Sequence, residues 1–310
     1  MPSSREFTFL SCNGKTPIRA REWLPDGPVG GVVQLAHGIA EHIDRYDDFA
    51  RFLAENGFAV VANDHLGHGK SIRSEDELGY FADSSGWEMA VGDMRRLTEL
   101  TKEQFPHVPY FLFGHSMGSF LARTYIIRYR AGLAGVVLSG TGQQPAFLVT
   151  AGKAAGNLEV RRHGAKYRSE FLNNMAFGKY NERITHVRTL SDWLSRDEAQ
   201  VDLYVEDPLC GYIPTASLFR DMMEGIGFIT TARNVRRMKK DLPVYFMSGD
   251  CDPVGEYGAG VMRAYKSFLS AGMSDVTLKL YHEGRHEMLN ELNRDEVYAD
   301  ILAWLRSKLS

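Results

Sequence analysis

The chain has 310 residues, 44% of them hydrophobic and 24% charged, a composition typical of a globular protein with a sizeable core. Its formal net charge of -3 gives no electrostatic reason to expect nucleic acid or an anionic membrane as the main partner. The three cysteines form no CxxC pair, no apolar leader opens the chain, and no run approaches the roughly 20 apolar residues of a membrane span. We therefore expect a cytoplasmic protein with free thiols.

Eight short runs of apolar and β-branched residues predict strands. In chain order they cover residues 6–10, 18–23, 32–35, 59–62, 110–113, 136–138, 244–247 and 276–280. Several of these runs are continuously apolar, which is typical of strands that are buried on both faces of a sheet.

Helical patterns lie between the predicted strands. They cover residues 47–56, 119–130, 257–271 and 294–309. Ser85, followed three residues later by Glu88, resembles a capping box and predicts the start of one more helix. The basic run 236–240 is interpreted as a solvated helix end, because cations favour the last turn of a helix.

The alternation of strands and helices predicts an α/β fold with a mostly parallel central sheet that is covered on both faces. In such a sheet the ligand site lies beyond the carboxyl ends of the strands. Between Gly142 and Pro214 the alternation gives way to partly helical sequence that is too apolar for a disordered linker. We interpret residues 143–214 as an inserted, mainly helical cap between two parts of the core, residues 1–142 and 215–310. A pocket is expected between cap and core.

The pentapeptide Gly-His-Ser-Met-Gly at residues 114–118 lies between a predicted strand and a predicted helix. A nucleophile elbow requires this context, with Ser116 on a sharp, exposed turn. Serine is a weak nucleophile, so a base must reach its hydroxyl, and the flanking glycines make the turn sterically possible. Taken alone, the pattern is equally compatible with a tight connection, because such patterns also arise by chance.

Two later loops supply the partners that a nucleophilic serine needs, in the chain order acid and then histidine. Asp250 and Asp252 follow the seventh predicted strand. We favour Asp252, which precedes a proline and lies further into the loop, and keep Asp250 as the alternative acid. His286 follows the eighth predicted strand in a glycine-containing loop, whereas His282 at the strand end is interpreted as structural. Together these signals predict a serine hydrolase.

Backbone amides are the remaining requirement, because charge develops on the substrate carbonyl oxygen during attack. The N–H of Met117, directly after the predicted nucleophile and at a helix N-terminus, is one expected donor. The N–H of Ile39, in the loop after the third predicted strand, is the other, with Gly38 allowing the backbone to turn.

Four sequence blocks carry a family resemblance and span nearly the whole chain. They are His-Gly-Ile-Ala-Glu-His at 37–42 with Arg-Tyr at 45–46, Asp-His-Leu-Gly-His-Gly-Lys-Ser at 64–71, the pentapeptide at 114–118, and Leu-Ser-Arg-Asp at 194–197 through to Asp-Pro-Leu at 207–209. With these blocks the chain resembles the monoacylglycerol lipase and lysophospholipase branch of the α/β-hydrolase superfamily. Residues 143–193 of the predicted cap offer no matching block.

The resemblance implies the α/β-hydrolase fold with its inserted cap. It implies the same site as the spacing does, with the nucleophile, acid, base and two oxyanion donors at Ser116, Asp252, His286, Ile39 and Met117. It also implies a supporting hydrogen-bond network near the site floor that takes no direct part in the chemistry. The members of this network are His37, Gly38, Glu41, His42, Arg45, Asp64, His65 and His115.

We expect hydrolysis of a small lipid ester, a monoacylglycerol or lysophospholipid, through an acyl-serine and without a metal or organic cofactor. The alternatives are a general carboxylesterase or aryl esterase for short acyl groups, an acyltransferase, and a non-catalytic binding protein of the same fold. The expected partner is a small-molecule ester and not nucleic acid; transient contact of the cap with a membrane surface and the oligomeric state stay open. Candidate wall residues of the pocket, each equally explained by packing, are Phe147, Phe171, Met175 and Met222.

Overall fold

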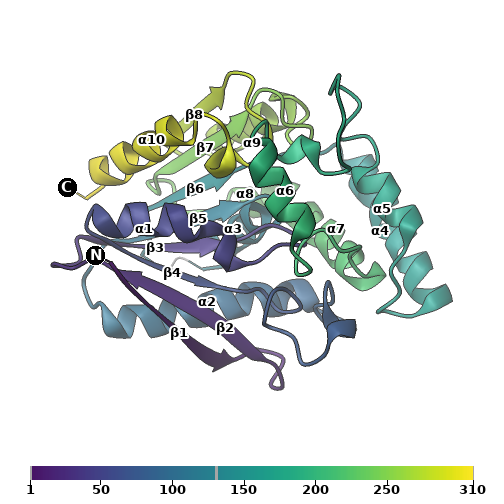
Figure 1. The fold of residues 1–310 in the computed structure, drawn as a ribbon, viewed down its shortest axis with the longest axis horizontal. Helices are drawn as coiled ribbons and strands as arrows, with labels where there is room; N and C mark the ends of the chain where they lie inside the picture. The colour runs from purple at the N-terminus through teal and green to yellow at the C-terminus, as the bar shows by residue number, and fades with distance from the viewer. Residues whose placement is uncertain (1, 130–131, 310) are drawn as a thin grey trace.

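A mixed sheet runs through the computed structural model, which describes residues 2–129 and 132–309 (Figure 1). Its strands, in the order in which they lie side by side, are β1 (Ser3–Leu10), β2 (Pro17–Leu24), β4 (Phe58–Asn63), β3 (Gly31–Ala36), β5 (Tyr110–His115), β6 (Gly135–Ser139), β7 (Val244–Gly249) and β8 (Val276–Tyr281). β2 pairs antiparallel with β1 and β4, and all other neighbours are parallel. The eight predicted strands and the predicted α/β class are confirmed.

The central strands are apolar at consecutive positions because both faces of the sheet are covered. In β5, Tyr110 and Leu112 belong to the core on one face, while Phe111 and Phe113 belong to the core on the other. The helices that contribute to the first core are α2 (Gly86–Gln104), α3 (Met117–Arg128), α7 (Ala216–Thr230) and α9 (Ala259–Ser270). Those that contribute to the second are α1 (Asp47–Glu55) and α10 (Arg294–Ser307).

Left-handed backbone lies at two predicted helix starts. The start of α2 directly after Ser85 is confirmed but its capping is not, and the predicted start of α9 is wrong. Ser85 has a φ of 57° and makes no capping bond with its side chain, so α2 begins without the predicted capping box. Glu88 forms an ion pair with Arg128 instead. α9 begins later than predicted, because Glu256 and Tyr257 have φ values of 49° and 55° that a right-handed helix cannot include.

The other helical predictions agree with the structure more closely. The helix predicted over 119–130 is α3, which ends at Arg128; Arg130 lies outside the described residues. The basic run 236–240 follows the short α8 (Ala232–Val235), and only Arg236 belongs to the helix end, as its C-cap. The short 3-10 helices are η1 (Ile43–Tyr46), η2 (Glu75–Glu77), η3 (Asp192–Leu194) and η4 (Met288–Asn290). Within the described ranges, no helix has both the length and the apolar character needed to cross a bilayer.

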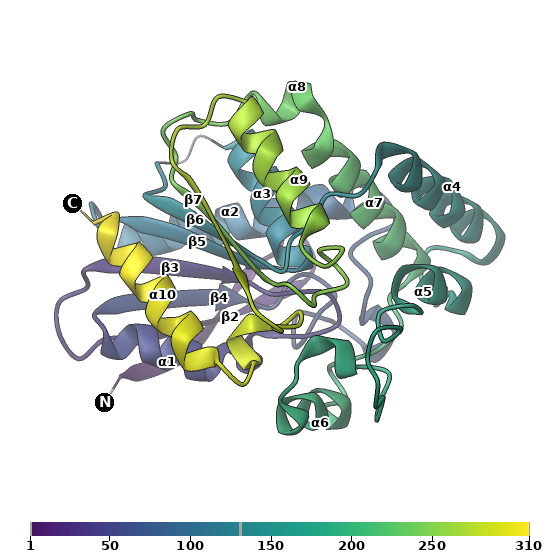
Figure 2. The ribbon, with the colours of Figure 1, turned by 90° about the horizontal axis from the view of Figure 1, so that it is seen from above.

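The segment between β6 and β7 carries three helices that lie beyond the carboxyl ends of the central strands. They are α4 (Ala146–His163), α5 (Glu170–Phe177) and α6 (Glu198–Glu206), which lie at the end of the molecule opposite the chain termini (Figures 1 and 2). α4 packs along α7, which in turn packs on α2 and α3. The guanidinium of Arg168 donates to the carbonyls of Leu78 and Ile213, and so ties the segment to the core. The division at residues 143 and 214 stays a prediction.

The turn between β5 and α3 brings the helix very close to the neighbouring strand β3. A Cβ on Gly118 would lie 2.0 Å from the carbonyl oxygen of Ala36, and a Cβ on Gly114 would lie 2.5 Å from the carbonyl oxygen of Gly118. No side chain fits at either position without a shift of the backbone, so both glycines are required for this close packing.

We expect Gly118→Ala to lower the free energy of unfolding by about 3 kcal/mol or more, because the new methyl group collides with main chain that cannot rotate away. Urea denaturation measures the change. Gly27→Ala is the matched control, since nothing lies within 4 Å of its Cβ position, and it should change the unfolding free energy by less than about 1 kcal/mol. Equal effects of the two substitutions would contradict the steric argument.

Candidate active site

Ser116 occupies a strained turn at the carboxyl end of β5. Its φ of 51° and ψ of -121° are rarely adopted by a residue with a side chain, and such strain persists where the surrounding structure holds it. The N–H of Ser116 donates to the carbonyl of Ser139, the last residue of the neighbouring strand β6, at 3.0 Å. The strand, turn and helix around Ser116 have the arrangement of a nucleophile elbow.

Asp252 and His286 come together from the loops after β7 and β8. The Nδ1 atom of His286 lies 3.0 Å from both carboxylate oxygens of Asp252, and both side chains are buried. The carboxylate also accepts bonds from the hydroxyl of Ser248 at 3.0 Å and the N–H of Val254 at 2.8 Å. Burial alone would raise the pKa of Asp252, but the charge of His286 and these hydrogen bonds lower it, so the group is ionised.

The alternative acid, Asp250, faces a different histidine. Its Oδ2 atom lies 3.1 Å from Nδ1 of His282, whose side chain is 88% exposed. Asp250 lines a hollow that does not include Ser116. The structure therefore separates two Asp–His pairs and brings only the pair of Asp252 and His286 to Ser116.

Ser116 and His286 line one cavity of about 310 Å³ between the sheet edge and the cap. In the described part of the chain, no hydrogen bond joins the hydroxyl of Ser116 to the ring of His286. The two residues are related by lining the same cavity. Such bonds are often long in the absence of substrate. The cavity is also lined by Gly38 and Ile39 from the loop after β3.

The cap contributes different residues to the cavity wall than the sequence predicted. Phe147, Phe171 and Met175 point outward and are 47% to 70% exposed, and Met222 is buried in the core on α7, so the predicted wall is wrong. The cap residues that line the cavity are Asn173, Asn174, Phe177, Gly178, Asn181, Val187, Leu190, Ser191, Trp193, Leu194, Tyr204, Gly211, Tyr212 and Pro214. The opposite face of α5 and the segment after it therefore form the wall.

The loop after β3, which carries Ile39, adjoins the turn that carries Ser116 and Met117. A Cβ on Gly38 would lie 3.2 Å from the Cβ of Ser116, which shows how closely the loop after β3 approaches the turn. Among the described residues, no acceptor bonds the N–H of Ile39. Met117 is the first residue of α3, where backbone N–H groups have no partner within the helix. Both amides are therefore available as donors.

A buried ion network joins this loop to the histidine loop. Arg45 donates to Glu41 at 2.9 Å and, through two nitrogens, to Glu287 at 2.5 and 2.6 Å. Glu41 in turn accepts from the N–H of Gly38 at 2.5 Å and the hydroxyl of Tyr46 at 2.9 Å. Burial raises the pKa of Glu41; it opposes ionisation of Glu287 too, but there Arg45 outweighs it and lowers the pKa to about 2.

Three histidines form a neutral cluster at the foot of the loop after β3. The ring of His37 lies 4.2 Å from that of His65 and 5.4 Å from that of His68, between centroids. His37 bonds the carbonyl of Gly38 through Nδ1 and accepts the N–H of His65 at Nε2, which fixes its tautomer. Burial lowers the pKa of all three, to about 3 for His65 and about 4 for His68. These residues support the loop and carry no charge.

Asp64 and His115 also hold main chain near the site. Asp64 accepts from the N–H groups of Ile43 and Lys70, both at 2.9 Å, and so joins the segments after β3 and β4. His115 lies 3.3 Å from the hydroxyl of Ser139 through Nδ1, and its ring centroid is 4.7 Å from that of His286. Burial lowers the pKa of His115 to about 3, so it stays neutral beside His286.

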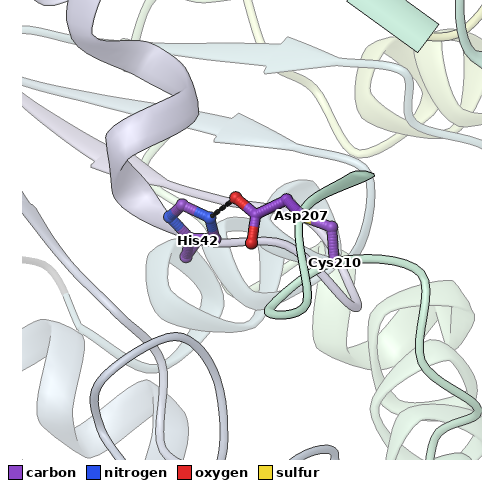
Figure 3. A group of neighbouring side chains, drawn as sticks. All are labelled: His42, Asp207 and Cys210. Carbon is purple, nitrogen blue, oxygen red and sulfur yellow. Dashed lines mark hydrogen bonds and ion pairs between the residues drawn. The ribbon is translucent and has the colours of Figure 1, made fainter. Parts of the chain in front are cut away.

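His42 connects the same loop to the end of the cap (Figure 3). Its Nε2 atom lies 2.7 Å from Oδ2 of Asp207, and nearby the N–H of Gly211 donates to the carbonyl of Ala40 at 3.0 Å. His42, Asp207 and Cys210 offer metal-binding atoms within 4.8 Å of one another, so this group has a spacing that could hold an ion. The hydrogen bond between His42 and Asp207 already satisfies two of those atoms. The predicted absence of a metal site stays a prediction.

Three residues at the site were not predicted from the sequence. Glu287 and Tyr46 bond the network, and the ring of Trp193 lies 5.0 Å from that of His286. Glu287 directly follows the predicted base, and Tyr46 belongs to a block of the family resemblance. Their positions in the sequence could therefore have indicated that both lie near the site. Trp193 carried no signal beyond its apolar character.

Replacing Arg45 with Met should cost about 3–5 kcal/mol of unfolding free energy, because Glu41 and Glu287 would be left buried without a counter-charge. Arg51→Met is the control, since Arg51 also pairs with a carboxylate four residues away but is 43% exposed, and it should cost less than about 1 kcal/mol. Urea denaturation of both variants at neutral pH measures the difference. Similar losses for the two variants would refute the role of the buried network.

Known proteins resemble this chain over nearly its whole length. A family model described as serine aminopeptidase, S33, matches residues 27–293. The monoacylglycerol lipase of Mycolicibacterium smegmatis is 31% identical, over 93% of this chain and 92% of that protein. The human monoglyceride lipase is 30% identical, over 93% of this chain and 86% of that protein.

Solved structures agree with the sequence comparison. A thermostable carboxyl esterase from Bacillus coagulans, in complex with glycerol, is 30% identical, with a TM-score of 0.92 and 99% coverage of both chains. A soluble variant of the monoglyceride lipase from Saccharomyces cerevisiae has a TM-score of 0.77 at 19% identity and shares the fold. The chain belongs to the serine aminopeptidase S33 family of α/β-hydrolases, in the branch that contains the monoacylglycerol lipases.

Proposed function

We propose that this hydrolase cleaves carboxylic esters of lipids with a small headgroup, with Ser116 as nucleophile, His286 as base and Asp252 as the acid that orients the base. One observation carries the proposal: Ser116 and His286 line the same cavity, while Asp252 bonds Nδ1 of that ring and leaves Nε2 for the serine. Relatives that are named monoacylglycerol lipases support an ester as substrate.

The reaction follows from the positions of these groups. His286 takes the proton of the Ser116 hydroxyl as the serine oxygen attacks the ester carbonyl, and a tetrahedral intermediate forms. His286 then gives this proton to the departing alcohol, the ester C–O bond breaks, and an acyl-serine remains. Water, deprotonated by the same ring, attacks the acyl carbonyl. The bond from this carbon to the serine oxygen then breaks, His286 returns the proton to that oxygen, and the carboxylic acid is released. Ionised Asp252 stabilises the imidazolium in both steps.

The N–H groups of Ile39 and Met117 are the proposed donors to the oxyanion of the tetrahedral intermediate. Both belong to main chain, so side-chain substitution at these positions leaves the donors in place. Loss of one donor of this kind typically raises the barrier by about 3–4 kcal/mol. The network around Arg45 supports the donors by holding the loop that carries Ile39.

The cavity wall favours a substrate with one apolar and one polar part. Its apolar residues are Phe177, Val187, Leu190, Trp193 and Leu194, which suit an acyl chain. Its amide side chains are Asn173, Asn174 and Asn181, which suit hydroxyl groups. A monoacylglycerol or a lysophospholipid meets both conditions, and a short-chain ester would leave the apolar wall unused.

The name of the family raises peptides with a free N-terminal amine as an alternative class of substrate. An aminopeptidase needs a free carboxylate to hold the ammonium group of its substrate. The carboxylates that line the cavity in the described chain belong to Glu41 and Glu287, and both are bonded to Arg45. The charge of these groups is therefore already compensated, which favours an uncharged ester.

The exposed apolar residues of the cap support transient contact with a lipid surface. They are Phe147, Leu148, Phe171 and Met175, which lie on α4 and on α5 and do not line the cavity. A surface of this kind suits an enzyme whose substrate is held in a bilayer or micelle. We also propose a cytoplasmic location, since all three cysteines are free thiols.

Wild-type protein should hydrolyse long-chain monoacylglycerols or lysophospholipids faster than nitrophenyl acetate or an amino-acid nitroanilide. Ser116→Ala should lose nearly all activity, a fall of at least about 10³-fold in kcat, while its circular dichroism stays unchanged. Release of fatty acid, measured on each substrate with the variant as blank, decides both points. An active Ser116→Ala variant would refute the nucleophile, and preference for the acetate would favour a general esterase.

The pH dependence of hydrolysis should report His286. Burial alone would lower the pKa of this ring, but Asp252 raises it above the ordinary value of 6.5. Only the neutral ring can act as base, so kcat/KM for a soluble ester should rise with pH and reach half its maximum above pH 6.5. His282→Gln is the control and should leave the profile in place, because His282 lies outside the cavity. A midpoint below pH 6.5 would contradict the pairing with Asp252.

A further inference from the structure

Trp193 lies at the end of the cap and contacts the ring of the proposed base. The centroids of the indole and the imidazole of His286 are 5.0 Å apart, and the ring planes meet at 41°. Asp252 holds the imidazole only at the Nδ1 edge. A flat ring at this distance limits how far the imidazole can tilt about that bond.

Main-chain hydrogen bonds hold the segments that carry the two rings side by side. The carbonyl of Trp193 accepts the N–H of His286 at 3.4 Å, and the carbonyl of Leu194 accepts the N–H of Glu287 at 2.7 Å. The guanidinium of Arg285 donates to the carbonyls of Asp192 and Ser195 at 2.6 and 2.9 Å. The end of the cap and the histidine loop therefore pair along several successive residues.

The orientation of Trp193 is set from within the cap. The backbone N–H of Trp193 donates to Oδ1 of Asn181 at 2.9 Å, and Nδ2 of Asn181 donates to the carbonyl of Thr189 at 2.8 Å. The ring of Tyr180 meets the indole edge-on at a centroid distance of 4.8 Å. The segment 180–192 thus determines where the indole lies, and any movement of this segment moves the indole.

Trp193 also lines two hollows. One is the cavity with Ser116, and the other is a hollow of about 500 Å³ that includes Asp250 and Cys251. In the first of them the indole contacts the imidazole that Asp252 holds. An aromatic face within about 6 Å of a cation attracts it, so the indole favours the imidazolium that forms during attack.

We propose that Trp193 is a positioning residue for His286, through which the cap holds the base in its working orientation. The indole restricts the imidazole and shields its bond to Asp252 from water, so the base is competent only while the end of the cap is in place. This inference rests on the proposed function for its effect on turnover. The ring contact itself does not depend on it.

Kinetics of matched variants test the effect on turnover. Trp193→Leu should lower kcat for a soluble ester by about 10- to 100-fold with little change in KM, because a misplaced base slows both chemical steps. Trp193→Phe retains a flat ring and should recover kcat to within about 3-fold of the wild type. Asn173→Ala is the control: Asn173 lines the same cavity from α5 and has no ring that contacts His286, Trp193 or Tyr180, so this variant should change KM more than kcat. An unchanged kcat in Trp193→Leu, or no recovery in Trp193→Phe, would overturn the proposal.

Fluorescence provides a readout that needs no turnover, because a protonated imidazole quenches a neighbouring indole. The difference between wild type and Trp193→Phe isolates Trp193 from the other three tryptophans. This difference should decrease as pH falls through the titration of His286, and should be flat in the same comparison made with His286→Gln. A difference signal that ignores pH, or that titrates without His286, would show that the two rings do not interact in solution.

Other titratable and charged groups surround the two rings and are accounted for by the His286→Gln comparison. They are Asp252, His115, Glu41, Glu287, Tyr180, Tyr257, Asp250, Cys251, Glu283, Arg183, Arg196 and Arg285. The two parts of the test also separate the inference from the proposed function. If Ser116→Ala stays active, the proposed mechanism fails while the fluorescence still reports the ring contact; if only Trp193→Leu is unimpaired, the inference alone fails.

Discussion

Arg45 is the residue on which the geometry of the site depends, because its guanidinium joins segments from three distant parts of the chain. It bonds Glu41 in the loop after β3 and Glu287 beside His286, and it lies 4.8 Å from the centre of the Tyr204 ring on α6. Glu41, Glu287 and Tyr204 are buried and the side chain of Arg45 is only 10% exposed, so water does not readily replace the guanidinium. The loop with the proposed oxyanion donor, the loop with the proposed base, and the cap are therefore held in one arrangement.

The two carboxylates that contact Arg45 have different environments. Glu287 receives two of its nitrogens, which lowers the pKa to about 2, whereas Glu41 also depends on the neutral donors Gly38 and Tyr46, and its pKa is raised. Desolvation offsets much of the attraction in a buried ion network, so the intact network adds little stability over apolar side chains of similar volume, whereas the loss of one member alone is costly. We interpret the network as a means of selecting one loop geometry, since any other arrangement leaves a buried charge without a partner.

The cap reaches the site through the segment that follows its helices. The exposed side chains of α4 and α5, such as Phe147 and Phe171, point away from the cavity, while the segment around Trp193 lines it and pairs with the histidine loop. For the proposed function, this arrangement would leave one face of the cap for contact with lipid and the other for the ester. Apolar pattern alone does not distinguish these faces, because an apolar stripe on a helix looks the same whether it meets a core, a cavity or a membrane.

The sequence by itself determined the strands, the α/β class, and the loops at which Ser116, Asp252 and His286 lie. These features depend on local patterns: continuous apolar runs, a Gly-x-Ser-x-Gly turn and polar residues directly after strands. At Ser85 the local pattern located the helix start correctly, but the left-handed backbone there excludes the predicted capping bond.

Only the tertiary structure decided which acid meets which histidine, which cap residues face the cavity, and that Glu287 and Trp193 belong to the site. Arg45 and Glu287 are 242 residues apart, and their contact exists because parallel strands bring the loops after β3 and β8 to the same edge of the sheet. A contact of that kind is fixed by packing in three dimensions, which no short stretch of sequence encodes.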